Sequence, residues 1–206
     1  MKMNNYPKIF VIFIALFGFF SVALAANLTT GVDEQAKLPY WQIKQKGMSL
    51  RLVQRLPIQT RAFYQARGFN KKHSETIAQS CLFQTVFKNI SDQQSITSPL
   101  TYDLDDWVIT YQGKKQKMKL REEWDEEWQT KKIKTPQRLA FEWGLYPTSQ
   151  TYKPGDYNWG LSVFNLKPGS RFNLEIVWWQ YGKKYEQVIR NIQCAEDINP
   201  QPTENL

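Results

Sequence analysis

The sequence predicts a mainly β protein: an antiparallel β-sandwich preceded by a short helical element over residues 49–80. Three observations predict this class. The 206 residues include 8 Trp, 10 Tyr and 12 Phe, an aromatic content that is far too high for a disordered chain. After residue 81, short apolar runs are separated by Gly and Pro turns. Before residue 80, apolar residues recur instead at spacings of three and four, which is typical of a helix.

The first 25 residues have the pattern of a secretory signal peptide. Lys2 and Lys8 precede an apolar run over 9–20, and Ala23-Leu24-Ala25 offers a small-residue cleavage site. We therefore expect export and cleavage after Ala25, which lowers the formal net charge from +8 to +6. An uncleaved anchor is the alternative, because the apolar stretch is nearly long enough to span a membrane. After cleavage we expect no stable membrane insertion.

The mature chain is expected to form one structural domain over 26–195, followed by an acidic flexible tail over 196–206. Residues 26–80 are predicted to be an extended lead-in and then the helical element. Within that element, Pro57 either kinks one helix or starts a second one. Gly68 suits a left-handed C-cap, and Asn70 suits the N-cap of a short helix that ends near Ser80.

The predicted β-sandwich occupies residues 81–195. The expected strands cover 81–87, 106–111, 114–120, 139–145, 157–164, 171–181 and 185–194. One segment in this region, 121–128, reads as a short amphipathic helix. Trp124 and Trp128 share one face of it, and we expect them to dock on the sandwich while the acidic residues face water.

A short corner motif refines the fold class. Residues Leu166-Lys167-Pro168-Gly169-Ser170-Arg171-Phe172 resemble the strand-crossing corner of immunoglobulin-like and fibronectin-type sandwiches, where an aromatic residue follows a Pro-Gly turn. Phe172 stands in place of the usual Tyr, so the hydroxyl hydrogen bond of that corner is missing. The resemblance implies an immunoglobulin-like fold and carries no function, because sandwiches serve many. No specific family is recognised across the mature chain.

The two cysteines, Cys81 and Cys194, both remain in the mature chain. In an oxidising compartment an even pair is most simply one disulfide. The alternative is a functional thiol or metal pair, but redox pairs are usually close in sequence. We expect a structural disulfide.

The sequence offers little for catalysis or for a metal or cofactor. Its single His, His73, lies in a polar, basic run, and no nucleophile motif accompanies it. No calcium-loop pattern occurs among the acidic residues. We therefore expect a non-enzyme without metal or cofactor. A carboxylate-based hydrolase is the least favoured alternative, and it would need two facing acids from a small set: Asp103, Asp105, Asp106, Glu122 and Glu123.

The candidate binding surface combines two hairpin tips with one aromatic strand. The tips share a Tyr followed by two Lys and would form a basic patch if both projected from the same end. We expect the helical element to cover the outer face of the strand over 174–181; if that face is exposed instead, Trp179 is the best anchor. The proposed surface consists of Tyr111, Lys114, Lys115, Trp179, Tyr181, Lys183 and Lys184.

These features predict a periplasmic or secreted protein that binds or helps assemble another envelope protein. Export makes nucleic acid an unsuitable partner for the positive charge. The main alternative is a carbohydrate-binding sandwich, because Trp and Tyr faces stack on sugar rings. A solvent-exposed, coplanar pair of tryptophans would favour the glycan, whereas a broad apolar patch with a lysine rim would favour the protein partner.

Overall fold

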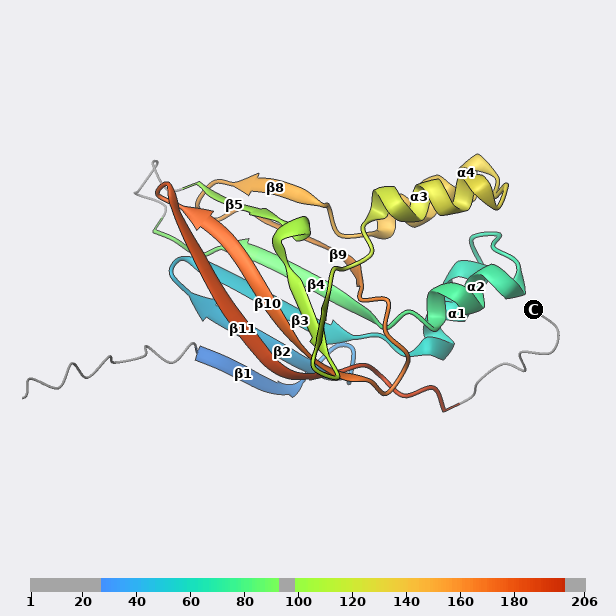
Figure 1. The fold of residues 1–206 in the computed structure, drawn as a ribbon, viewed down its shortest axis with the longest axis horizontal. Helices are drawn as coiled ribbons and strands as arrows, with labels where there is room; N and C mark the ends of the chain where they lie inside the picture. Colours follow the sequence, from blue (N-terminus) through green and yellow to red (C-terminus); the bar gives the residue numbers. More distant parts are fainter. Residues whose placement is uncertain (1–26, 93–98, 199–206) are drawn as a thin grey trace, which may run out of the picture.

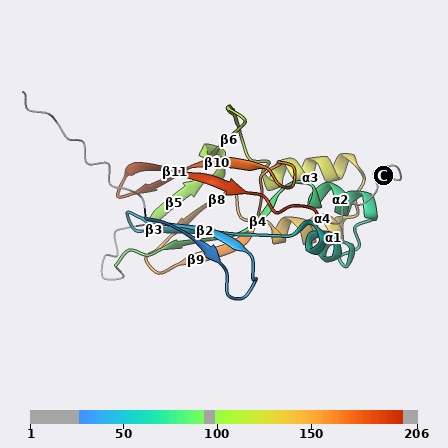
Figure 2. The same cartoon turned by 90° about the horizontal axis from the view of Figure 1, so that it is seen from below.

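The computed structural model describes residues 27–92 and 99–198. The predicted signal peptide, 1–25, lies outside the described residues. Within these ranges, strands account for 43% of the residues and helices for 24%, so the described part of the protein is mainly β. Two antiparallel sheets form separate layers, and four helices gather at one end of them (Figures 1 and 2). No helix among the described residues is long and apolar enough to cross a membrane.

The first sheet has the order β1-β2-β3-β4-β9. Its strands are β1 (Asn27–Val32), β2 (Pro39–Gln45), β3 (Met48–Gln54), β4 (Leu82–Asn89) and β9 (Tyr157–Val163). Residues 27–45, expected as an extended lead-in, are thus a hairpin within this sheet. The helix expected from residue 49 is wrong up to Gln54, because Leu50 and Leu52 alternate into the core as in a strand.

The second sheet is built around the long strand β10. Its strands are β5 (Leu100–Asp103), β6 (Val108–Tyr111), β7 (Lys114–Gln116), β8 (Ser149–Tyr152), β10 (Arg171–Gln180) and β11 (Lys183–Gln193). β11 pairs with one edge of β10, while β6 and β5 pair with it at Asn173–Glu175 and at Trp179–Gln180 respectively. A short 3-10 turn, η1 (Leu104–Asp106), follows β5.

The order of the first sheet differs from the immunoglobulin-like expectation. Strands β1 to β4 are consecutive in the sequence and each pairs with the next, as in a meander. Immunoglobulin sandwiches instead use Greek-key connections between their sheets. The mainly β prediction is confirmed, whereas the immunoglobulin-like part is not.

The main hydrophobic core lies between the two sheets. Phe83 and Phe87 of the first sheet pack in one buried cluster with Leu174, Ile176 and Trp178 of the second. These three residues of β10 are fully buried and alternate along the strand, as the period of two requires. The two sheets therefore bury a common set of side chains between them.

Each sheet has one helix pair inserted between its strands, and both pairs lie at the same end of the core. Helices α1 (Pro57–Gln65) and α2 (Lys71–Ala78) connect β3 to β4, and α3 (Arg121–Thr130) and α4 (Thr135–Gly144) lie between β7 and β8. The pairs share a second buried cluster, which includes Tyr64, Phe69, Trp124, Trp128, Phe141 and Leu145. Trp124 and Trp128 are buried as expected, but they dock against this helical cluster.

Several local predictions for the helices hold. Pro57 is at the start of α1, Gly68 has a φ of +86°, and the Asn70 side chain caps α2 by accepting from the His73 amide at 2.8 Å. The strand expected at 139–145 is wrong, because residues 139–144 belong to α4 and Leu145 follows its end. Pro136 opens that helix, and Phe141 and Leu145 face inward at a spacing of four.

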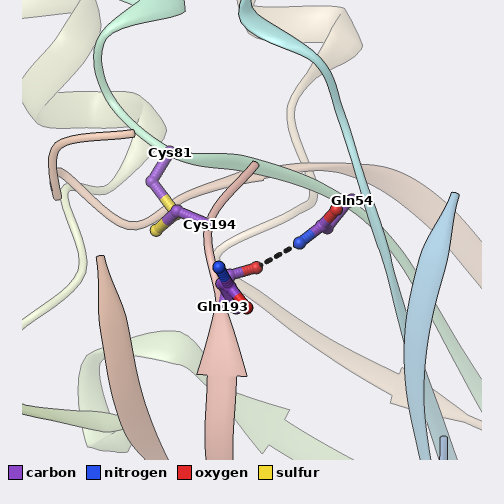
Figure 3. The surroundings of a disulfide bond; sticks show 4 residues. All are labelled: Gln54, Cys81, Gln193 and Cys194. Carbon is purple, nitrogen blue, oxygen red and sulfur yellow. Dashed lines mark hydrogen bonds between the residues drawn. A yellow bond between two sulfur atoms is a disulfide. The ribbon is translucent and has the colours of Figure 1, made fainter. Parts of the chain in front are cut away.

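Two links tie the first sheet to the C-terminal end of the chain. The Cys81–Cys194 disulfide joins the start of β4 to the end of β11, with the two Cα atoms 5.4 Å apart. Beside it, the Gln54 amide donates to the Gln193 carbonyl at 2.6 Å (Figure 3). The paired cysteines match the prediction of a structural disulfide.

A buried ionic cluster holds the segment that follows the disulfide. Arg61 on α1 forms ion pairs with Glu75 on α2 and with Asp197, and all three side chains are nearly inaccessible. Gln79 donates to both carboxylates, at 2.9 and 2.8 Å. Asp197 lies in the segment expected to be a flexible tail, so the first residues of that segment are fixed. Residues 199–206 lie outside the described residues.

We expect this cluster to make stability sensitive to acid. The hydrogen bond from Arg61 lowers the pKa of Glu75, despite the opposing effect of burial. A carboxyl whose pKa falls on folding stabilises the native state above its ordinary value near 4.5, and that contribution disappears as the pH falls through the lowered value. Urea unfolding from pH 7 down to pH 3 should therefore show a steeper loss for wild type than for Glu75→Gln. Equal pH dependence would contradict this role.

Candidate ligand-binding cleft

The two lysine-bearing hairpin tips do not form one patch. β6 runs antiparallel to β10 with Thr110 opposite Asn173, so the β6–β7 tip lies near the start of β10. The β10–β11 tip, at Tyr181 and Gly182, lies at the other end of the same strand. Eight residues of strand separate these positions, a span of roughly 26 Å at about 3.3 Å per residue. Figure 1 shows the two tips pointing away from each other.

The individual members of the expected surface also have local partners. Lys115 lies 3.6 Å from Glu175, and Lys184 lies 3.6 Å from Glu186. Lys114, Lys183 and Tyr181 are exposed, and Tyr111 and Trp179 are half-buried against the main core. The helices do not cover the Trp179 face, because they sit at the end of the sheets. The residues of the expected basic surface therefore do not form one continuous patch.

Three of the five carboxylates considered for hydrolysis accept local hydrogen bonds. Asp103 accepts from the Asp105 amide, Glu123 accepts from the Leu120 amide, and Glu122 accepts from the Thr148 hydroxyl. His73 packs against Trp128 with ring centroids 5.7 Å apart, and burial together with nearby lysines lowers its pKa. Within 27–92 and 99–198, no group of three or more His, Cys, Asp or Glu could hold a metal ion.

A cleft of about 570 Å³ opens where α1 and α4 meet the outer face of the first sheet. Its volume is in the range of small-molecule sites. The lining consists of aromatic, amide and guanidinium side chains with a few small residues. We call it the aromatic–arginine cleft, and its lining residues are Arg55, Gln59, Thr60, Phe63, Tyr64, Arg67, Gln84, Ala140, Trp143, Gly144, Trp159 and Leu161.

Two tryptophans of this cleft are strongly exposed. Trp143 on α4 is 79% exposed and Trp159 on β9 is 62% exposed, while most other described tryptophans are buried. Trp159 points outward because Gly160 faces the other way, where a Cβ would lie 2.7 Å from the backbone of Tyr146. Trp143 points outward because Phe141 and Leu145 occupy the inner face of α4. Tyr157, 61% exposed, continues the same face of β9 beyond Trp159.

The charged residues of the cleft are two arginines. Arg67 stacks on Phe63, with its guanidinium carbon 3.3 Å from the ring centroid, and donates to the Phe63 carbonyl. Arg55 is half-buried, and burial lowers its pKa. Among the described residues, no Asp or Glu lines this cleft. The cleft is therefore positively charged and partly dehydrated.

One buried hydroxyl at the cleft lacks a hydrogen-bond partner among the described residues. Tyr64 is fully buried, lines the cleft, and has an unpaired Oη. Burial raises the pKa of Tyr64, so the hydroxyl stays protonated and available as a donor at neutral pH. Leaving such a group unsatisfied costs about 1–3 kcal/mol. A polar ligand group that reached it would recover part of this free energy.

A second hollow of similar size is a weaker candidate. It measures about 590 Å³ and is lined by residues of α1 together with Phe69 and Lys71. Its arginine, Arg61, already pairs with Glu75 and Asp197. The arginine of this hollow is thus used for structure, whereas Arg55 of the aromatic–arginine cleft has no ion pair within the described residues.

The residues of the cleft were not identifiable from the sequence. Trp143 falls in a segment whose alternation predicts a strand, and Arg55 falls in the predicted helical element, where it reads as part of a solvated face. The helical element was expected to cover a strand of the other sheet. One signal was present: Tyr157 and Trp159 share a face of a strand with polar neighbours.

No protein-family model, curated protein or solved structure matches this chain.

Proposed function

We propose that the protein is an exported, non-enzymatic module that binds a carbohydrate in the aromatic–arginine cleft. The single observation that carries this proposal is the exposure of Trp143 and Trp159 at a concave site. Contiguous exposed apolar surface on a monomer often marks a binding site. Sugar rings present flat C–H faces that pack on indoles.

The polar lining supports a sugar rather than a purely apolar ligand. Gln59 and Gln84 carry amides that both donate and accept hydrogen bonds, and Arg55 carries a planar array of donors. Neighbouring hydroxyls on a sugar ring suit such paired donors and acceptors. A few oriented polar groups among apolar surface are typical of a specific small-ligand site.

Export is supported by two features. The disulfide is typical of proteins from an oxidising compartment. Residues 1–25 have a signal-peptide pattern with cleavage expected after Ala25. Both features support a periplasmic or secreted location, which would place the cleft in contact with envelope glycans.

A protein partner is the second candidate. The exposed aromatics and arginines of the cleft match the residue types that dominate protein-interface energetics, namely Trp, Tyr and Arg. The basic patch that the sequence predicts for this role does not form, because the two hairpin tips lie at opposite ends of β10. An assembly partner would have to use the aromatic–arginine cleft instead.

Truncating either exposed tryptophan should abolish most carbohydrate binding. We expect Trp143→Ala and Trp159→Ala each to weaken retention in affinity electrophoresis at least tenfold, the equivalent of about 1.4 kcal/mol. Both side chains are largely exposed, so unfolding stability should change by no more than about 0.5 kcal/mol. Tyr181→Ala, at the β10–β11 tip, is the control and should bind like wild type. Unchanged binding by both tryptophan variants would refute the site.

A further inference from the structure

We infer that the ligand of the aromatic–arginine cleft is an acidic glycan, a polymer or oligomer of uronic acid, whose carboxylate pairs with Arg55. This inference rests on the proposed function and specifies its ligand. The starting observation is that several arginines form ion pairs with acidic side chains and Arg55 does not. Arg51 pairs with Asp33, Arg61 with two acids, and Arg138 with Asp125. Arg55 has no ion pair within the described residues, although it is half-buried.

A partly dehydrated cation without a counter-ion is costly. The acid with the main electrostatic influence on Arg55 is Asp33, but its carboxylate binds Arg51 at 2.8 Å and accepts the amides of Gln35 and Ala36. It is therefore committed to another arginine and to its own turn. A ligand carboxylate entering the cleft would supply the missing charge, and the planar guanidinium can bind it through two parallel hydrogen bonds.

The surroundings of Arg55 favour an anion on a ring-shaped ligand. Arg67 adds a second positive charge to the lining. The lining contains no carboxylate that would repel the ligand. Trp143 and Trp159 supply the apolar faces. Among sugars, only an acidic one satisfies the stacking surfaces and the charge together.

The overall charge acts in the same direction. After loss of the predicted signal peptide the chain keeps a formal charge of +6. A positive protein attracts polyanions at low ionic strength, which raises the encounter rate but gives little selectivity. Selectivity must then come from the cleft, and the test has to separate the two contributions.

The test uses one polymer in two forms. Polygalacturonate carries a carboxylate on each sugar, and its highly methyl-esterified form has the same backbone without the charge. We expect wild type to bind the acidic form at least tenfold more tightly in affinity electrophoresis at 0.15 M salt. Arg55→Gln should lose about tenfold affinity for the acidic form and leave the affinity for the esterified form unchanged.

Matched controls separate specific pairing from bulk charge. Arg190→Gln removes one exposed positive charge from β11, and the double variant Lys183→Gln/Lys184→Gln removes two from a hairpin tip. Each should bind the acidic form as wild type does. If these variants weaken binding as much as Arg55→Gln, attraction is nonspecific and the inference is wrong.

The outcomes distinguish the inference from the proposed function. Equal binding of both polymer forms, lost in Trp143→Ala, would overturn the acidic preference and leave carbohydrate binding in place. Binding to neither form would overturn the uronate inference, and a neutral glycan array would then test the function itself. Capture of a protein through the intact cleft, without any glycan, would favour the protein partner and overturn both.

Discussion

Removing the Cys81–Cys194 disulfide should lower the free energy of unfolding by about 5 kcal/mol. The two cysteines are 113 residues apart, and the chain-entropy model gives a value of this size for a loop of that length. The double variant Cys81→Ala/Cys194→Ala, compared with oxidised wild type in urea, measures it. Reduced wild type should unfold at the same midpoint as the variant.

The position of this disulfide makes the effect a global one. It connects the start of β4, directly after α2, to the end of β11 in the other sheet. Without it, the unfolded chain gains the freedom of more than half its length. A loss below about 1 kcal/mol would contradict this account, because native contacts such as the Gln54–Gln193 hydrogen bond do not restrict the unfolded chain.

Replacing Arg61 should cost about 3–5 kcal/mol. Its guanidinium is nearly inaccessible and binds Glu75 and Asp197, with Arg61 Nη2 to Glu75 Oε1 at 2.8 Å and Arg61 Nη1 to Asp197 Oδ1 at 3.0 Å. Arg61→Met leaves two buried carboxylates without this cation, and breaking buried pairs from one side has penalties of this order. Urea unfolding at pH 7 measures the change.

A second arginine provides the control for this experiment. Arg138 pairs with Asp125 at 2.9 Å, but both side chains are partly exposed. Arg138→Met should therefore cost no more than about 1 kcal/mol. Neutralising both acids in the Arg61→Met background, through Glu75→Gln and Asp197→Asn, should recover part of the lost stability. No recovery would mean that packing, rather than buried charge, explains the effect.

Local sequence patterns predicted the elements whose side-chain period and turn residues agree. β10 and β11 are long, rich in strand formers and joined by a turn at Gly182, and the prediction of both strands was right. Asn70 and Pro57 are residue types that favour the start of a helix, whatever packs against that helix. The disulfide was predictable from the even number of cysteines and the expected oxidising compartment alone.

The errors arose where the same apolar residues fit both the side-chain periodicity of a helix and that of a strand. In β3, Leu52 and Val53 are both buried, so the strand reads as one face of a helix. In α4, the alternation of Leu139, Phe141 and Trp143 reads as a strand, yet only Phe141 is buried. Burial is decided by which sheet or helix pair lies opposite, and the local sequence does not contain that information.

The candidate cleft was missed for the same reason. It assembles residues from α1, α4, β4 and β9, and none of these elements predicts the position of the others. The hairpin tips were recognisable as basic turns, but the register of β6 and β10 places them at opposite ends of one strand. Local chemistry was readable from the sequence, and its spatial grouping was not.

Carbohydrate binding in the aromatic–arginine cleft is tested most directly by following the indole N–H signals of the tryptophans by NMR while a short galacturonate oligomer is added. Trp143→Ala and Trp159→Ala assign the two critical signals. We predict saturable shifts of these two signals, with little change for the buried Trp107 and Trp178. A shift confined to Trp179, which is paired with Lys184 beside the hairpin tip, or no saturable shift at the cleft, would contradict the account.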